Sequence, residues 1–589
     1  MPYERHDPQF QYVANMNWTK GRHQIRYGID FYKQDLNHLQ AEFAGQNHGA
    51  QGGFTFTGGA TQIRNGPSAS NFNSYASFLL GAVNNYGTTY QVDDVYGTRT
   101  SMFNAYIQDT WQVTPKLTFN VGVRYLNIPM PRRPGRGMER YDFVNNKMLV
   151  CGVGQVPVDC GTKNSNLLFT PSVGIAWRPN DKTVVRTGFG INYDPLNLIR
   201  ALRTNFPMLL ILNSPGTDTY VPVSRLEQGI PLPVVPSLGN GVIDIPSNYA
   251  LTSTGDEFKR AYIMSWNLTI QRQLWKGFTL QAGYVANRTV RQTNFLDLNA
   301  GQVIGAGNAG RPFNKPGFNR TVQTSLVTAL GHTNYDSLQS QLTRRFSNGF
   351  QVNFAYTWSK AIGVCCNASN DGGPAIQALA YLGKNHAVMP FDRPHNFQST
   401  FVYELPFGKG KQWASSGKAG NMLLGGWQLN GLLSKYSGSP FTVNSDGASL
   451  NLPGSTQTAD VLSTPKQLGN YGRGQAWYDW TTFAPVAGAS GVRFGTSGIN
   501  TLRGPGIANL DIGLFRRFSV TERVNIQFRA EALNITNTPQ LANPSSNISS
   551  LRTTNGAFSG GVFEVTGTAN TGRDGLVQRA FRLGLRVGF

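Results

Sequence analysis

The feature that most constrains this chain is a strict alternation of apolar and polar residues that recurs along its whole length. In residues 117–125, LTFNVGVRY, apolar side chains take every odd position and Thr, Asn, Gly and Arg take the even ones. The same period of two runs through QIRYGIDFY, VRTGFGINYD, FTLQAGYVAN, FQVNFAYTWS, RVNIQFRAEA and the final RAFRLGLRVGF. A period of two is the side-chain repeat of a β-strand with two unlike faces, so the pattern predicts an all-β protein.

Alternation alone would also fit a soluble β-sandwich, in which the apolar face packs against a core. The strands expected here run about 9 to 12 residues, which suits a tilted transmembrane strand, whereas soluble strands most often have about 5 to 6. Trp and Tyr lie near the ends of the apolar faces, at Trp18, Trp111, Trp177, Trp358 and Tyr125. Such placement is typical of the aromatic belt at a membrane interface. Both features favour a transmembrane antiparallel β-barrel of the outer-membrane type.

The connections between the expected strands are of two kinds. Tight turns such as Lys276 and Gly277 join strands in pairs, and long segments rich in Gly, Pro, Asn and Ser separate the pairs. The long segments are expected at about 36–102, 129–170, 195–261, 292–334, 361–394, 438–501 and 536–578. Short turns on one side and long extracellular loops on the other are typical of outer-membrane barrels. Seven pairs and the terminal strand give about 15–16 strands, the first at residues 10–19.

Composition supports a membrane sheet and argues against other classes. Only 14% of residues are charged and 40% are hydrophobic, with no run of about 18 apolar residues that would cross a bilayer as a helix. The formal net charge of +21 comes from scattered Lys and Arg, without the basic clusters of a nucleic-acid-binding protein. We therefore expect anionic lipid headgroups, and no nucleic acid, as the neighbours of these charges.

No motif in the chain indicates catalysis, a cofactor or a metal. GAGNAG, at Gly305, Gly307 and Gly310, matches a dinucleotide-binding glycine pattern, but the RPFNKPG that follows cannot open a helix. The histidines are dispersed, and the cysteines lack metal-ligand spacing. Cys151 and Cys160 could form a loop disulfide in an oxidising compartment or remain two thiols. The sequence thus predicts no enzyme, no cofactor and no metal site.

Several sequence segments resemble the barrel of TonB-dependent receptors, in particular that of the large Oar-like subgroup. They are NAYIQDTWQVTPKLTFNVGVRY, FDRPHNFQSTFVYELPFGKGK, LLGGWQLNGLLSKYSGSPFTV, LRGPGIANLDIGLFRRFSVTERVNIQFRAEALNITNTPQLANP and RAFRLGLRVGF, in this order from about residue 10 to the end. The resemblance implies a 22-stranded outer-membrane barrel around an amino-terminal plug. It also implies energised uptake, through TonB, of a solute too large for porins, such as a siderophore, vitamin, oligosaccharide or peptide.

The chain departs from this family at its beginning. No signal peptide, TonB box or plug is visible, so we expect residues 1–589 to be the carboxy-terminal barrel portion of a longer receptor, which would contact TonB only through its amino-terminal part. Fifteen strands would leave seven of the 22 unaccounted for. We accordingly expect that residues 10–19 and 579–589 do not form a complete ladder with each other.

The same pattern assigns roles to particular residues. The polar faces should turn toward the barrel lumen at Arg26, Asp30, Arg124, Arg186, Asp194, Arg529, Glu531, Arg582 and Arg586. Loop aromatic residues that could contact a solute are Tyr220, Tyr249, Tyr471, Trp477, Tyr478 and Trp480, although packing is the commoner role of such residues. The end of the chain resembles the signal read by barrel-assembly machinery, at Phe581, Leu583, Leu585, Val587 and Phe589.

Two other functions remain open from the sequence. One is a non-transporting surface barrel for adhesion or protein export, and the other is a porin-like diffusion channel. In each case the expected location is the bacterial outer membrane, with its phospholipid and lipopolysaccharide as partners.

Overall fold

The structure is a computed structural model of residues 1–589. It describes residues 4–39, 49–61, 71–92, 96–195, 205–215, 220–364, 373–408, 410–413, 423–447, 450–486, 492–519, 521, 523–569 and 578–589. Cys365 and Cys366 lie outside the described residues.

One sheet of 18 strands, antiparallel except for the pairing of β17 with β21, dominates the molecule. Three of its strands are short: β1 (Glu4–His6), β17 (Leu251–Thr254) and β23 (His386–Val388). The other fifteen are β2 (Gln9–Lys20), β3 (His23–Leu39), β7 (Tyr96–Thr114), β8 (Leu117–Asn127), β12 (Leu168–Asn180), β13 (Thr183–Tyr193), β19 (Tyr262–Gln273), β20 (Phe278–Asp297), β21 (Thr324–Ser347), β22 (Phe350–Val364), β24 (His395–Glu404), β25 (Trp427–Tyr436), β30 (Ile507–Ser519), β31 (Asn525–Leu533) and β34 (Ala580–Gly588). Each of these fifteen pairs antiparallel with the next, from β2 to β34, which confirms the predicted run of strands.

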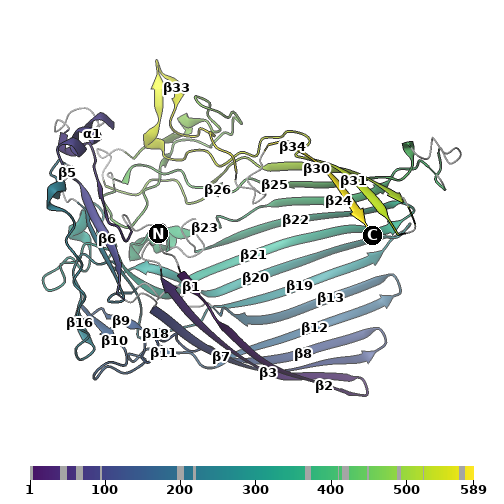
Figure 1. Ribbon diagram of the computed structural model, residues 1–589, viewed down its shortest axis with the longest axis horizontal. Helices are drawn as coiled ribbons and strands as arrows, with labels where there is room; N and C mark the ends of the chain where they lie inside the picture. Colours follow the sequence, from purple (N-terminus) through teal and green to yellow (C-terminus); the bar gives the residue numbers. More distant parts are fainter. Residues whose placement is uncertain are drawn as a thin grey trace.

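The two ends of this sheet differ in their connections (Figure 1). At one end, which we call the turn end, tight turns close most of the hairpins, and the exception is the longer connection between β24 and β25. Lys276 and Gly277 between β19 and β20, and Asn348 and Gly349 between β21 and β22, have the positive φ angles that tight hairpin turns require. At the other end, the loop end, long connections join one hairpin to the next, and the chain finishes at the turn end.

Cross-strand register gives the sheet two unlike faces. On one face Leu338 of β21 lies between Tyr284 and Trp358, and Leu268 of β19 extends this row beyond Tyr284. These side chains are exposed: Leu338 is 45% and Trp358 56% accessible. An extended apolar face left open to the surroundings is unfavourable in water and suits a hydrocarbon environment. We call it the lipid face, and its opposite the inner face.

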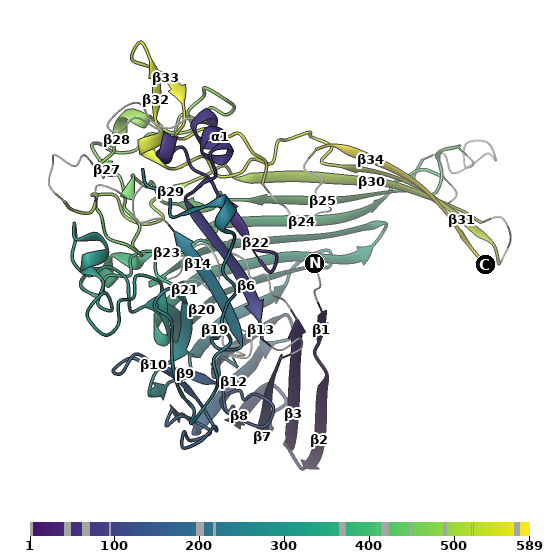
Figure 2. The same ribbon diagram turned by 60° about the vertical axis from the view of Figure 1, so that its left-hand side comes forward.

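The sheet does not close on itself. Among the described residues β2 pairs only with β3, and β34 pairs only with β31, so no ladder joins the first long strand to the last. Figure 2 shows these strands as two separate edges. The expectation that residues 10–19 and 579–589 would not pair is confirmed. Both edge strands run from the loop end to the turn end, so a ladder between them would have to be parallel.

The loop end carries its own small folded units. Two three-stranded sheets are formed by β9 (Glu139–Asp142), β10 (Lys147–Val150) and β16 (Val242–Asp244), and by β4 (Gly53–Thr55), β6 (Asn85–Gln91) and β14 (Leu209–Pro215). Five strand pairs add β5 (Ala82–Val83) with β15 (Ser224–Arg225), β11 (Lys163–Asn164) with β18 (Glu257–Phe258), β26 (Pro440–Phe441) with β29 (Leu502–Arg503), β27 (Asp460–Val461) with β28 (Phe483–Ala484), and β32 (Arg552–Thr554) with β33 (Ala557–Gly560).

Helices are few. In the described residues the helical elements include the α-helix α1 (Asn71–Leu79) and the 3-10 turns η1 (Gly59–Thr61), η2 (Leu226–Gln228), η3 (Gly307–Gly310), η4 (Leu379–Asn385), η6 (Trp480–Thr482) and η8 (Ile548–Ser550). Within the described ranges no helix is long and apolar enough to cross a membrane. Several strands also extend past the bounds expected for the loops, since β20 reaches Asp297 and β21 begins at Thr324, both inside 292–334.

Candidate functional site

The inner face of the sheet is polar, and hydrogen bonds connect its side chains from strand to strand. Asp30 accepts hydrogen bonds from Gln11 (3.1 Å) and Asn104 (3.5 Å), which lie on the two flanking strands. The Tyr106 hydroxyl donates to Asn15 (2.8 Å), and the Arg124 guanidinium lies 5.2 Å from the ring centroid of Tyr106. These contacts hold the polar groups in fixed positions along the inner face.

Register places most of the nine predicted lumen residues on this face. Arg26, Asp30, Arg124, Arg186, Arg529, Glu531, Arg582 and Arg586 all alternate with residues of the lipid face, whereas Asp194 lies just beyond β13 at the loop end. Arg186 donates to Gln271 (2.8 Å), Arg529 donates to Gln527 (2.7 Å), and Glu531 lies opposite Arg582. That they line a solute path stays a prediction.

The loop aromatic residues divide into packed and exposed ones. Tyr249 belongs to a loop core with Phe206 and Tyr141, and Tyr478 belongs to a second core, where its hydroxyl donates to the carbonyl of Arg503. Tyr249 and Tyr478 are 6% and 7% exposed, so they hold loops together and offer no surface to a solute. The remaining four are Tyr220, Trp477 and Trp480, which are partly buried, and Tyr471, which is 55% exposed.

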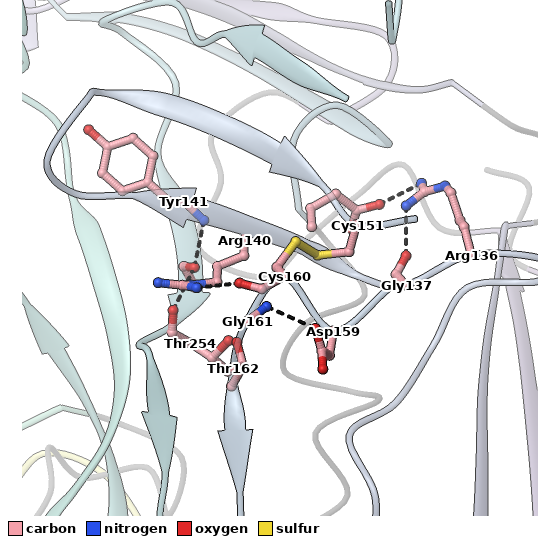
Figure 3. The surroundings of a disulfide bond; sticks show 12 residues. Arg136, Gly137, Arg140, Tyr141, Cys151, Asp159, Cys160, Gly161, Thr162 and Thr254 are labelled. Carbon is pink, nitrogen blue, oxygen red and sulfur yellow. Dashed lines mark hydrogen bonds and ion pairs between the residues drawn. A yellow bond between two sulfur atoms is a disulfide. The ribbon is translucent and has the colours of Figure 1, made fainter. Parts of the chain in front are cut away.

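A disulfide, shown in Figure 3, and a buried charge cluster beside it fix the loop between β8 and β12. Cys151 and Cys160 are bonded, with their Cα atoms 5.2 Å apart. Beside them the fully buried Glu139 carboxylate accepts hydrogen bonds from Arg133 (2.8 Å) and Arg136 (2.6 Å). Burial on its own would raise the pKa of Glu139, but the charges and hydrogen bonds of the two arginines outweigh it and hold that pKa below its ordinary value.

A cavity of about 530 Å³ opens at the loop end between two long loops. Its lining residues are Arg473, Gly474, Arg552, Ser559, Glu564 and Thr566. The Glu564 carboxylate accepts hydrogen bonds from the backbone amides of Gly474 (2.6 Å) and Gly561 (2.7 Å), and both lower its pKa. The bond from Gly474 joins the two loops. The Arg552 guanidinium also lies 3.8 Å from this carboxylate. The cavity therefore presents two guanidinium groups and two hydroxyl groups around a carboxylate that backbone amides and one arginine already hold.

Sequence reasoning missed this cavity because the residues that form it lie in two distant segments of the chain and carry no local motif. It also missed Arg260, which is 2% exposed and whose guanidinium donates to the carbonyl of Ile128 (2.9 Å). Burial lowers the pKa of Arg260 to about 10, against a smaller opposing effect of Asp194. In the described residues no cluster of three or more His, Cys, Asp or Glu side chains could hold a metal ion.

The predicted assembly signal forms the exposed edge strand β34. Phe581, Leu583 and Leu585 are 70%, 77% and 68% exposed on the lipid face, opposite Ala532, Ala530 and Phe528. Val587 continues the row, and Phe589 lies beyond the strand at the turn end, 98% exposed.

The fold defines a class, that of outer-membrane β-barrel proteins, because a meandering antiparallel sheet carries an exposed apolar face, a polar inner face, tight turns at one end and long loops at the other. A family model described as "Outer membrane beta barrel domain" matches residues 1–574. The chain belongs to this family and is a protein of the bacterial outer membrane.

Solved structures similar to this chain are outer-membrane transporters and receptors. The Escherichia coli outer membrane transporter YddB is 10% identical to this chain (TM-score 0.49), and the match covers 100% of this chain and 55% of the YddB chain. The siderophore receptor PiuA from Acinetobacter baumannii is 11% identical (TM-score 0.44), and the match covers 100% of this chain and 56% of the PiuA chain. A mutant of the ferric enterobactin receptor PfeA from Pseudomonas aeruginosa is 10% identical (TM-score 0.46), and the match covers 100% of this chain and 54% of the PfeA chain.

The chain thus spans about half the length of these structures. A search of curated protein sequences gave no significant match.

Proposed function

We propose that this chain is the barrel portion of a TonB-dependent receptor, of the Oar-like subgroup, that takes up a large solute across the outer membrane with energy supplied through TonB. The observation that carries the proposal is the polar inner face, which runs the length of the sheet beneath folded loops that carry a solute-sized cavity. A barrel wall of this kind offers hydrogen-bonding groups to a solute along its path, while the apolar face keeps the path inside the bilayer.

The loop-end cavity is the part of this proposed path that would meet the solute first. About 530 Å³ lies within the range of ligand sites in proteins, roughly 300 to 1,000 Å³. Arg473 and Arg552 supply planar groups of five N–H donors each, which suit a carboxylate or phosphate oxygen pair. Two arginines face the single carboxylate of Glu564, which leaves the cavity with a net positive charge, so it favours a solute that carries an anionic group.

The test compares solute depletion by cells that express the receptor with depletion by cells that lack it, each in strains with and without TonB. Spent medium is analysed by untargeted mass spectrometry, which detects depleted compounds of any identity. The proposal predicts that at least one anionic solute disappears only when both receptor and TonB are present. Depletion that persists without TonB would favour a diffusion channel, and surface binding without depletion would favour the adhesion or export role.

A further inference from the structure

The turn end of the lipid face carries a row of basic residues that the proposed uptake does not use. On β2, β19 and β21 the apolar row of the lipid face stops at Trp18, Ile270 and Leu342. The next residue on the same face, two positions nearer the turn end, is basic in each case: Lys20, Arg272 and Arg344. Two strand residues span about 7 Å, so these charges lie directly beyond the apolar band.

Basic residues in the neighbouring turns extend this row around the sheet. Lys116 lies between β7 and β8, Lys182 between β12 and β13, and Lys276 between β19 and β20. We call Lys20, Lys116, Lys182, Arg272, Lys276 and Arg344 the basic girdle. All except Arg344 are exposed, and none of the six makes an ion pair with a carboxylate in the described part of the chain.

Aromatic contacts fix the depth of the girdle in the membrane. Lys20 Nζ lies 5.6 Å from the Trp18 ring, and the Arg344 guanidinium lies 5.8 Å from Phe278 and 5.3 Å from Phe350. Trp275, in the turn beside Lys276, is 70% exposed. Tryptophan side chains settle at the boundary between hydrocarbon and headgroups, so cations stacked on and just beyond them lie at the level of the lipid phosphates.

The loop end of the same face has basic residues too, but acidic partners neutralise several of them. Asp35 lies 3.5 Å from both Lys33 and Arg99, and Asp336 lies 2.9 Å from Arg288. These carboxylates occupy cations that would otherwise face lipid. Cations without an ion pair in the described residues therefore remain at both ends of the lipid face: Lys360 and Lys435 at the loop end, and Lys20, Arg272 and Arg344 at the turn end. In the usual orientation of such barrels lipopolysaccharide lies on the loop side, so the cations at the turn end are the ones that face the phospholipid leaflet.

We propose that the basic girdle binds the anionic headgroups of phospholipids in the leaflet at the turn end, and so selects acidic lipids for the shell around the barrel. Each Lys or Arg near an anionic membrane surface strengthens association by about fivefold. A soluble periplasmic anion or peptidoglycan is the less favoured occupant, because Lys20, Arg272 and Arg344 share the face that the bilayer covers. The proposal rests on the membrane location of the chain and is independent of the solute and of TonB.

The experiment measures lipid selectivity of the full chain in mixed bilayers by spin-label electron paramagnetic resonance. The probes are spin-labelled phosphatidylglycerol and phosphatidylcholine, and the quantity is the ratio of their association constants. The wild-type chain is expected to favour phosphatidylglycerol severalfold at low salt and to lose most of this preference at 1 M salt, because screening shortens the range of charge interactions to about 3 Å. No preference at low salt, or one that salt leaves unchanged, would overturn the proposal.

A charge-matched pair of variants locates the effect. The girdle variant carries Lys20→Gln, Lys116→Gln, Arg272→Gln and Lys276→Gln, and leaves Arg344 because it packs on two aromatic rings. The control carries Lys163→Gln, Lys315→Gln, Lys384→Gln and Lys466→Gln, four exposed loop-end positions. The ratio should fall to near one in the girdle variant and stay at the wild-type value in the control.

Heat-modifiable gel migration shows whether each variant is folded, and the salt response of the wild-type chain tests the proposal even if the girdle variant does not fold. Equal loss of selectivity in both variants, or binding of the wild-type chain to peptidoglycan without any lipid preference, would contradict the proposal.

Discussion

The Glu139 side chain has no solvent exposure, yet it stays charged because two arginines hold it. Arg133 is itself 4% exposed, so the three groups form an ion cluster that the loop has removed from water. Such a cluster adds little net stability against an apolar replacement, but breaking it leaves a buried charge without its partner. At the scale of single residues, this cluster and the adjacent disulfide are what give the loop after β8 a defined conformation.

The cluster makes loop stability depend on pH. The folded-state pKa of Glu139 is lower than its ordinary value of 4.5, so its contribution is fully present above about pH 4.5 and is lost as pH falls through the folded-state pKa. We expect hydrogen exchange of amides in β9 and β10, corrected for intrinsic rates, to speed up below pH 4.5. Protection that is unchanged down to pH 2 would show that Glu139 does not hold this loop.

Replacing the carboxylate tests the same cluster at constant pH. Glu139→Gln should destabilise the loop unit by about 3–5 kcal/mol, because Arg133 would then be buried against a neutral amide. The matched control is Asp142→Asn, in the same strand β9 but only partly buried, which should cost far less. Limited proteolysis of the folded protein would report both, and equal cleavage of the two variants would contradict the assignment.

The cavity arginines give a second residue-scale prediction. Arg473→Gln and Arg552→Gln together should lower solute affinity at least tenfold, because each charged hydrogen bond to an anion is worth about 1.5–3 kcal/mol. Lys466→Gln, an exposed loop charge outside the cavity, should leave affinity unchanged. The measurement is the concentration dependence of uptake, and unchanged affinity in the double variant would move the binding site elsewhere.

At the scale of strands, the sequence predicted the long strands of the sheet well and the small sheets and packed cores of the loops poorly. Strand positions follow from a local period of two, and tight turns are marked by pairs such as Lys276 and Gly277, so the hairpins could be read directly. The small loop sheets could not, since β6 pairs with β14 more than 100 residues away and neither has a local signal of that contact. Tyr249 and Tyr478 show the same limit, because nothing in their neighbourhood reveals that distant loop segments bury them.

The lipid face of β21 allows a strand-scale prediction with a neighbouring control. Leu338→Arg places a charge among Tyr284 and Trp358 and should destabilise the folded barrel by about 1–2 kcal/mol, between the cost of a charge at the interface and its cost at the bilayer midplane. Gln339→Arg places the same charge on the inner face and should be nearly neutral. Unfolding in denaturant from lipid vesicles measures the difference, and equal effects at the two positions would contradict the assignment of faces.

At the scale of the whole molecule, the fifteen long strands of the described residues form a sheet whose two edges do not pair with each other. Its edge strands β2 and β34 run in the same direction, so antiparallel closure needs an odd number of further strands between them. Unpaired N–H and C=O groups cannot remain exposed to hydrocarbon, so in a bilayer each open edge needs a partner for its hydrogen bonds.

The faces and ends of the sheet were also predictable to different degrees. The polar and apolar faces follow from parity in the sequence, and the unequal lengths of turns and loops distinguish the two ends of the barrel. The neutralisation of basic residues at the loop end could not be predicted in this way, because it depends on Asp35 and Asp336 lying beside Arg99 and Arg288 on neighbouring strands.

The most direct test of the account is the environment of successive residues along one strand in a bilayer. Nitroxide labels placed singly at residues 338–343 of β21 would be probed with oxygen, which concentrates in hydrocarbon, and with a water-soluble nickel chelate. The account predicts a period of two: oxygen collisions peak at 338, 340 and 342, and chelate collisions peak at 339, 341 and 343. Accessibilities that vary smoothly along the strand, or favour the chelate at 338, 340 and 342, would contradict it.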